Sequence, residues 1–221
     1  MTTTTDHSPL PKIKIHPGFV RIFHWLNVIG MFLMITSGWR IYNASPVFEA
    51  ISFPAMLTLG GWLGGALQWH FAAMWLLVLN FLMYLVLGFA SGHFRRSLTP
   101  ISPKAVATDL GKALRYKLPH EVGRYNAVQK ASYIGVIAVI IVTIASGLVV
   151  WKSVQFQTLG ILFGGYEGAR IVHFFGMAAI CAFIFMHLVL VLIVPSTFIP
   201  MITGWARTNH EPNHKEANSN G

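Results

Sequence analysis

Four long apolar segments set the pattern of hydrophobic and polar positions along this chain. A membrane-spanning helix needs about 20 consecutive, mostly apolar residues, and segments of this kind occupy 22–41, 71–90, 132–151 and 171–194. Apart from Arg40 at the end of the first, they contain no Lys, Arg, Asp or Glu. Small residues recur in each, which lets helices approach closely in lipid. The pattern predicts an all-α membrane protein, a bundle of four transmembrane helices.

A fifth apolar stretch, 47–69, has a different character. It carries Glu49, Pro54 and two Gly-Gly pairs, and it meets the second predicted span without room for a turn. Glycine and proline are the residues that most often interrupt regular structure. We therefore predict an interfacial or re-entrant loop over 43–69, with a fifth span as the alternative.

The composition agrees with a membrane protein and excludes several other classes. Apolar residues make up 54% of the 221 residues and charged residues only 10%, whereas a soluble domain carries about 25% charged residues. The mean hydropathy is +0.59. A soluble enzyme would lack the charge to cover its surface, and a single cysteine, Cys181, excludes a disulfide-rich scaffold.

The basic residues are distributed unevenly between the two sides of the predicted bundle. Thirteen of the 16 Lys and Arg residues lie toward the termini or in the connection 93–130, and the other three are Arg40, Lys152 and Arg170. Cytoplasmic segments are enriched in Lys and Arg, so we predict that both termini and the 93–130 connection are cytoplasmic. This orientation accounts for the net charge of +9 without a nucleic-acid partner.

One transmembrane domain, 21–200, lies between two polar tails, 1–20 and 201–221. The composition of the C-terminal tail predicts disorder. Polar residues precede the first span and no small-residue cleavage site follows it, so we expect no cleavable signal peptide. The first span would then act as its own insertion signal.

A short sequence echo links the first and third spans. The first contains Thr36-Ser37-Gly38 and the third contains Ala145-Ser146-Gly147. We interpret the echo as small-residue helix packing rather than as a duplicated unit.

Ten histidines are many for a chain so poor in charge. The five that lie in polar tails or loops are expected to be solvated, and they are His7, His16, His120, His210 and His214. The five that lie in or at the ends of the spans are His24, His70, His93, His173 and His187. An ionisable side chain inside a membrane is costly and is a functional hypothesis by default. The alternative for each is a neutral histidine hydrogen-bonded to a neighbouring helix.

The spacing of His173 and His187 distinguishes between kinds of site. The two residues are 14 positions apart in the fourth span, which corresponds to a rotation of roughly 1400°, about 40° short of four turns, and a rise of roughly 21 Å. Both rings therefore leave nearly the same face of the helix at different depths. This spacing excludes a shared site for one small metal ion and fits two stacked prosthetic groups, each taking one axial nitrogen.

Each such group needs a second ligand at a matching depth. His70, at the start of the second span, is level with His173, and His24, near the start of the first span, is the natural partner of His187. His93 is the alternative inner ligand. Two histidine pairs at two depths predict bis-histidine ligation of two haem irons, because neutral imidazole suits haem iron. Cys181 is interpreted as a small buried hydrophobe rather than an axial ligand.

The propionates of haem need cationic or hydrogen-bonding partners near the membrane surfaces. Arg21 is the candidate on the inner side, and Arg40, Lys152 or Arg170 on the outer side. The alternative role for each is that of an ordinary snorkelling residue at the interface.

The site pattern consists of the four paired histidines, His24, His70, His173 and His187, with Arg21 and Trp25 on either side of His24. This pattern resembles that of the di-haem cytochrome b subunits of membrane-bound formate dehydrogenases and nickel–iron hydrogenases. Bacterial cytochrome b561 and the cytochrome b subunit of thiosulfate reductase belong to the same broad group. The resemblance covers about 13–200. It implies two haem b groups and electron transfer within a respiratory chain of the bacterial inner membrane.

The same resemblance implies a quinone substrate. The formate dehydrogenase subunits carry Tyr-Asn-Ala-Gly-Gln-Lys before the third span, where the Asn and Gly contribute to a menaquinone pocket beside the inner haem. In this chain 125–130 reads Tyr-Asn-Ala-Val-Gln-Lys, so Asn126 matches and Val128 departs from the pattern. The alternative role of Asn126 is a helix cap for the third span.

The predicted loop 43–69 indicates the kind of redox partner. Its Leu-Gly-Gly-Trp-Leu-Gly-Gly run looks more like the cytochrome b proteins found with periplasmic sulfite-oxidase-like molybdopterin oxidoreductases than like the hydrogenase type. We therefore expect electron transfer between a periplasmic redox subunit, molybdopterin-type or hydrogenase-like, and the quinone pool, with substrate specificity in that partner. The alternatives are a stand-alone cytochrome b561-like oxidoreductase acting on a small periplasmic donor, and a haem-free transporter or anchor with a histidine proton relay.

Overall fold

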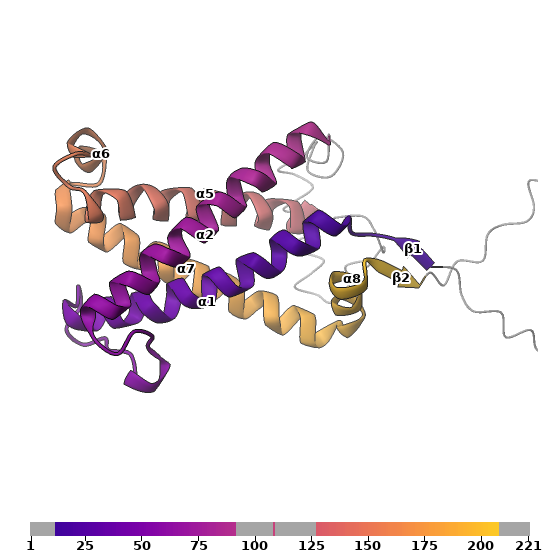
Figure 1. The fold of residues 1–221 in the computed structure, drawn as a ribbon, viewed down its shortest axis with the longest axis horizontal. Coiled ribbons are helices and arrows are strands. Elements are labelled where there is room, and N and C mark those ends of the chain that lie inside the picture. Colours follow the sequence, from indigo (N-terminus) through magenta and orange to yellow (C-terminus); the bar gives the residue numbers. More distant parts are fainter. Residues whose placement is uncertain (1–11, 92–107, 109–126, 208–221) are drawn as a thin grey trace, which may run out of the picture.

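The computed structural model describes residues 12–91, 108 and 127–207 (Figure 1). Most of this part of the chain forms four long helices, which are α1 (Gly18–Ala44), α2 (Leu63–Ala90), α5 (Ala127–Trp151) and α7 (Gly165–Ile193). Each is long and apolar enough to cross a membrane. The prediction of a bundle of four membrane-spanning helices is confirmed.

Short elements connect and cap the long helices. They are β1 (Lys12–Lys14), the 3-10 turns η1 (Ala55–Leu57) and η2 (Pro195–Thr197), the helices α6 (Gln157–Leu162) and α8 (Phe198–Thr203), and β2 (Trp205–Arg207). Pro195 marks the end of α7, because the residue before a proline is disfavoured in a helical conformation. The chain then turns through η2 into α8.

The second long helix begins earlier than the sequence pattern predicts. α2 starts at Leu63, so 63–69 belong to the helix and the preceding connection is shorter than the predicted loop 43–69. The turn is made by Gly60 and Gly61, whose φ angles are 104° and 69°. Gly65 has another reason to be glycine, since a Cβ there would collide with the carbonyl oxygen of Gly60. The second Gly-Gly pair is therefore needed for close packing at the start of a helix, although in the sequence such a pair indicates a loop.

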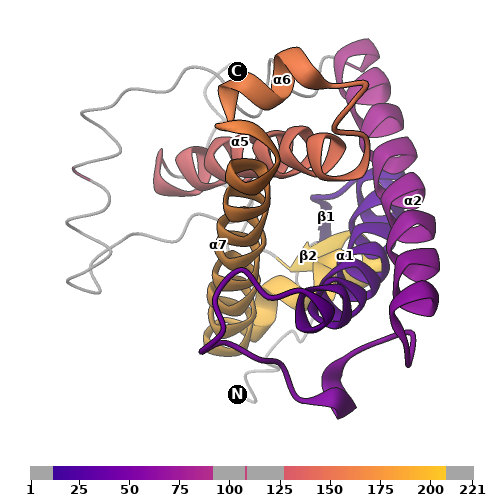
Figure 2. The ribbon, with the colours of Figure 1, turned by 90° about the vertical axis from the view of Figure 1, so that its left-hand side faces the viewer.

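The four long helices form two packed pairs. α1 lies beside α2 and α5 crosses α7, whereas close backbone approach between the two pairs is sparse among the described residues (Figure 2). Within the first pair, the buried Asn80 amide of α2 donates hydrogen bonds to the Phe23 carbonyl at 3.0 Å and to Asn27 Oδ1 at 2.8 Å. Hydrogen bonds between helices compensate for missing water in lipid.

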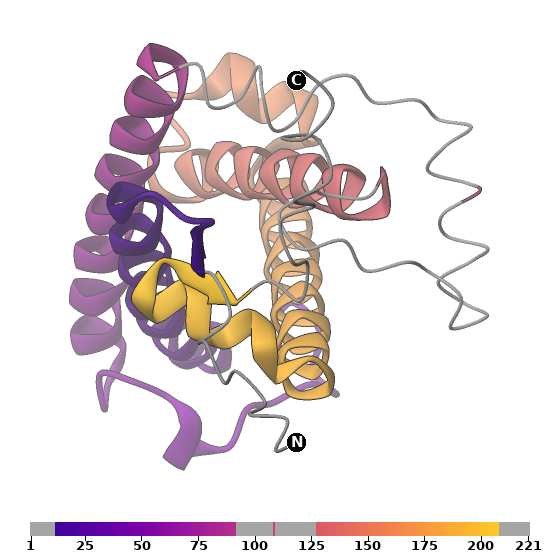
Figure 3. The same ribbon diagram turned by 90° about the vertical axis from the view of Figure 1, so that its right-hand side faces the viewer.

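The two ends of the bundle differ. At one end, called the terminal end, β1 and β2 pair antiparallel with Ile13 opposite Ala206, so both ends of the described chain meet there beside α8 (Figure 3). The Ile15 amide also donates to the Gly204 carbonyl at 2.9 Å. The opposite end, called the loop end, carries the connections 45–62 and 152–164.

The outward faces of the helices are apolar. Leu192 is 78% exposed, Phe89 72% and Val86 66%. Exposed apolar side chains of this number on four long helices are expected where the surrounding solvent is lipid. The outer surface therefore agrees with a membrane-embedded bundle.

Two glycine substitutions test this description of the start of α2. We expect Gly65→Ala to destabilise the protein by about 1–3 kcal/mol, since its Cβ meets the backbone oxygen of Gly60. Gly135→Ala in α5 is the matched control, because no atom lies within 4 Å of the added Cβ, and it should be neutral or stabilising by about 0.5–1 kcal/mol. Thermal unfolding in detergent, followed by circular dichroism, measures both. Equal unfolding temperatures for the two variants would contradict the packing.

Candidate functional site

Two pairs of facing histidines lie at different depths in the bundle. His24 of α1 faces His187 of α7 near the terminal end, with ring centroids 6.2 Å apart. His70 of α2 faces His173 of α7 near the loop end, with centroids 6.4 Å apart. Sequence reasoning expected these two pairs, and the structure brings the members of each together.

The loop-end pair is held by a serine and a glycine on each neighbouring helix. Ser37 Oγ of α1 lies 3.1 Å from Nδ1 of His70, and Ser146 Oγ of α5 lies 3.4 Å from Nδ1 of His173. A Cβ on Gly38 would lie 3.3 Å from Cε1 of His70. Each imidazole therefore lies against a neighbouring backbone at a position that has no side chain.

The echo between the first and third spans is thus part of the site. On the second helix pair, a Cβ on Gly147 would lie only 3.0 Å from Cε1 of His173. The interpretation as small-residue packing holds, but the serine hydroxyls were missed as partners of the rings. The Ser-Gly repeat could have revealed them, since the two dipeptides occupy corresponding places beside the two loop-end histidines.

Backbone groups add a second partner to each ring of the loop-end pair. Nδ1 of His173 lies 2.9 Å from the Thr143 carbonyl oxygen, and the corresponding backbone neighbour of the His70 ring is Met34. Met34 and Thr143 each stand three residues before the serine that contacts the same ring. The two sites are therefore built in the same way on two different helix pairs.

The terminal-end pair has different surroundings. The His24 ring packs edge-on against Trp25 with centroids 5.3 Å apart, and the His187 ring stacks on Phe183 at 6.3 Å. Nδ1 of His24 is buried and has no hydrogen-bond partner among the described residues. Within the described ranges, the rings at this end have no serine or carbonyl contact of the kind that holds the loop-end rings.

Arg21 links α1 to α8 beside the terminal-end pair. Its guanidinium donates a hydrogen bond to the Ile202 carbonyl, and Trp25 Nε1 donates to the Met201 carbonyl at 3.2 Å. A mostly apolar groove of about 490 Å³ lies between the two helices, lined by Gly18, Arg21, Ile22, Trp25, Met201 and Ile202 among others. The groove brings one cation and an apolar wall to the same helical turns as His24.

Aromatic side chains pack together at the loop end. Trp39 stacks on Phe53 with centroids 4.8 Å apart, and Tyr42 stacks on Phe174 of α7 at 5.0 Å. Phe48 packs against Phe174 at 5.4 Å. These contacts join α1, its following loop and α7 into one aromatic layer.

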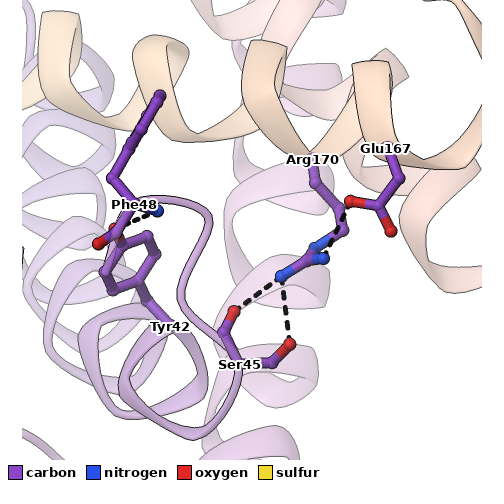
Figure 4. Close-up of polar contacts among 5 residues, drawn as sticks. All are labelled: Tyr42, Ser45, Phe48, Glu167 and Arg170. Atoms are coloured by element: carbon purple, nitrogen blue, oxygen red, sulfur yellow. Dashed lines mark hydrogen bonds and ion pairs between the residues drawn. The ribbon is translucent and has the colours of Figure 1, made fainter.

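Arg170 connects α7 to the end of α1 beside this aromatic layer (Figure 4). One guanidinium nitrogen of Arg170 donates to the Ser45 carbonyl at 2.6 Å and to Ser45 Oγ at 3.0 Å, and another donates to Glu167 at 2.9 Å. Nearby, the Tyr42 hydroxyl donates a hydrogen bond to the Phe48 carbonyl and accepts one from the Phe48 amide. Arg170 therefore joins the start of α7 to the end of α1.

The other candidate residues have varied surroundings. Lys152 Nζ lies over the Trp151 ring at 5.2 Å, and Arg40 makes no ion pair within the described part of the chain. Cys181 is a free thiol whose Sγ lies 3.6 Å from Met177 Sδ. His93 and Asn126 lie outside the described residues, as does most of each polar tail.

The geometry of the two pairs fits haem iron. No group of three or more His, Cys, Asp or Glu side chains able to hold a bare metal ion occurs among the described residues. Metal–imidazole bonds are about 2.0–2.1 Å long and each nitrogen lies roughly 1.1 Å from its ring centroid, so an axially ligated metal separates two centroids by about 6.3 Å. The observed 6.2 and 6.4 Å agree with this value.

Comparison with known proteins supports the same group. The family model described as prokaryotic cytochrome b561 matches residues 15–204. The chain belongs to the prokaryotic cytochrome b561 family. Membership implies haem b as the prosthetic group and a multi-span bacterial membrane protein. This b561-type cytochrome is also 53% identical over 191 residues to a putative protein-methionine-sulfoxide reductase subunit, YedZ1, from Azospira oryzae, covering 86% of this chain and 96% of that protein.

The role of Arg170 can be tested against its own ion-pair partner. We expect Arg170→Gln to lower stability by about 1.5–3 kcal/mol, the usual worth of hydrogen bonds from a charged group, because the bonds to Ser45 are lost. Glu167→Gln is the control, since the Glu167 side chain is 71% exposed and an exposed pair contributes less than about 1 kcal/mol. Thermal unfolding in detergent measures both. A larger loss in Glu167→Gln would contradict the assignment.

Proposed function

We propose that this chain is a di-haem membrane subunit that transfers electrons between a redox partner at the loop end and a quinone at the terminal end. The observation that carries the proposal is the presence of two facing histidine pairs at the two ends of one helix, at 6.2 and 6.4 Å. A single haem would need only one pair. A chain that binds two can connect the two membrane surfaces.

His70 and His173 would hold one haem, and His24 and His187 the other. A bound haem b supplies a one-electron redox centre. The chain would supply four imidazole nitrogens, glycines that leave room at the loop-end rings, and a low-dielectric surrounding. Arg21, Arg40 and Arg170 are proposed as propionate contacts, although Arg170 also binds Ser45.

The terminal end is proposed to be cytoplasmic. The described N- and C-terminal strands pair at that end, and thirteen of the 16 basic residues lie toward the termini or in the 93–130 connection. Enrichment of Lys and Arg on the cytoplasmic side then makes the loop end periplasmic.

A periplasmic redox subunit is the proposed partner at the loop end. In the 45–62 connection, Met56 is 90% exposed and Trp62 is 69% exposed. Apolar side chains with exposed fractions this high suit contact with another protein. The name of the Azospira oryzae relative describes it as a reductase subunit. By analogy, this chain would donate to or accept from a catalytic subunit that determines the substrate.

Quinone is the proposed partner at the terminal end. The groove between α1 and α8 offers an apolar wall with a guanidinium and an indole beside it, which suits a flat apolar molecule with polar oxygens. Asn126 stays a candidate for the same role by its motif. Haem content and quinone reduction separate this proposal from a haem-free transporter, and the need for a protein partner separates it from a stand-alone oxidoreductase.

Removal of one ligand from each pair tests the di-haem assignment. We expect His173→Ala and His187→Ala each to retain one haem of two, because each removes one of the two axial nitrogens at a single site. The pyridine haemochrome assay, with the reduced-minus-oxidised spectrum, measures haem per chain. His120→Ala, in the polar connection, is the control and should keep both. Full haem content in both α7 variants would refute the assignment.

Affinity purification tests the partner. We expect a periplasmic redox subunit to co-purify with the tagged chain and Met56→Asp to reduce its yield severalfold, since a charge at an apolar contact is costly to desolvate. Met56→Leu keeps the surface apolar and should retain the partner. If the purified chain alone reduced quinone from a small donor and no subunit co-purified, the stand-alone function would replace the proposal.

A further inference from the structure

Ser37 and Ser146 are buried hydroxyls whose contacts can be counted completely. Both side chains are 0% exposed, so no solvent competes for their hydrogen bonds. Each hydroxyl contacts the backbone of its own helix and Nδ1 of a histidine on the neighbouring helix. They differ in this from Thr36, which is also buried but whose hydroxyl, among the described residues, contacts only carbonyls of α1.

The hydrogen count determines the direction of the serine–histidine contacts. A hydroxyl has one hydrogen and two lone pairs. Ser37 Oγ donates within its helix, to the Leu33 carbonyl or to the Met34 carbonyl at 3.2 Å, and Ser146 Oγ donates to the Thr143 carbonyl at 3.0 Å. Since carbonyl oxygens can only accept, the single hydrogen is used there. Each serine can then only accept a hydrogen bond from Nδ1–H.

The consequence for each ring is a fixed tautomer. With the proton on Nδ1, Nε2 of His70 and of His173 carries the lone pair and is free to bind a metal. The neighbouring carbonyls act in the same sense, because the Thr143 oxygen, 2.9 Å from Nδ1 of His173, also requires a donor. The glycine beside each ring restricts its tilt by direct contact.

We propose that Ser37 and Ser146 are positioning residues that hold His70 and His173 as metal-binding tautomers and lower the reduction potential of the loop-end haem. The inference depends on the proposed function, in that haem is bound by this pair. An acceptor on Nδ1–H makes an imidazole more basic, and a more basic ligand favours ferric over ferrous iron. The terminal-end haem lacks this influence from His24, whose Nδ1 has no partner among the described residues.

Isosteric removal of each hydroxyl tests the proposal. The measurements use the His187→Ala background, which leaves the loop-end haem alone. The midpoint potential of this haem is determined by potentiometric titration of its spectrum. Ser37→Ala should raise the midpoint potential, changing the ratio of oxidised to reduced haem at a fixed potential by up to about tenfold, or 59 mV for one electron. Ser146→Ala should give a smaller rise, because its contact is longer, 3.4 Å against 3.1 Å.

Control variants separate this effect from general disturbance of the helix. Thr36→Val removes a neighbouring hydroxyl that touches no histidine and should leave the potential unchanged. Ser37→Ala in the His173→Ala background should leave the terminal-end haem unchanged. If Ser37→Ala fails to retain haem, Ser37→Cys, with a weak acceptor of similar size, should still raise the potential.

The outcomes distinguish failure of the inference from failure of the proposed function. An unchanged or lower potential in haem-loaded Ser37→Ala, or an equal shift in Thr36→Val, would overturn the positioning role while leaving haem binding intact. If His173→Ala and His187→Ala keep their full haem content, the ligand assignment itself fails. The low-temperature electron paramagnetic resonance spectrum of the ferric haem should also change in Ser37→Ala, because it is sensitive to imidazole orientation and basicity.

Discussion

A membrane interior offers no water to polar side chains, so each imidazole inside this bundle depends on partners within the protein. α7 carries two such rings, His173 and His187, on nearly one face and roughly 21 Å apart. α2 presents a ring to the first and α1 presents a ring to the second. Because α7 carries two buried imidazoles, its neighbouring helices must provide a partner group at each of the two depths.

The polar contacts between long helices follow the same division into two helix pairs as the backbone packing. Hydrogen bonds such as Asn80 to Asn27 and Ser146 to His173 act within a pair. The described contacts that join the pairs lie near the ends, where Arg170 binds Ser45 and Tyr42 stacks on Phe174. The two pairs of facing histidine rings also lie between one helix pair and the other.

The number of helices and the grouping of histidines could be predicted because both depend on local pattern and helical period. Uncharged runs of about 20 residues have few alternatives, and a 14-residue spacing fixes the face and depth of His173 and His187. The start of α2 was missed because Gly65 meets Gly60 only in the folded chain. The roles of Ser37 and Arg170 were missed for the same reason, since their partners lie 33 and 125 residues away.

The two ends of the bundle differ in the surfaces that they offer, in a way that agrees with the proposed partners. At the loop end, Arg170, the stacked aromatic rings and the serine contacts fix each element to another helix. At the terminal end, one short helix and a groove of about 490 Å³ flank His24. A protein partner is bound best by a surface that needs no ordering, whereas a small apolar molecule needs a groove that it can enter from lipid. An aromatic contact surface at one end and a groove at the other are therefore what the proposed transfer between a docked subunit and a diffusing quinone would require.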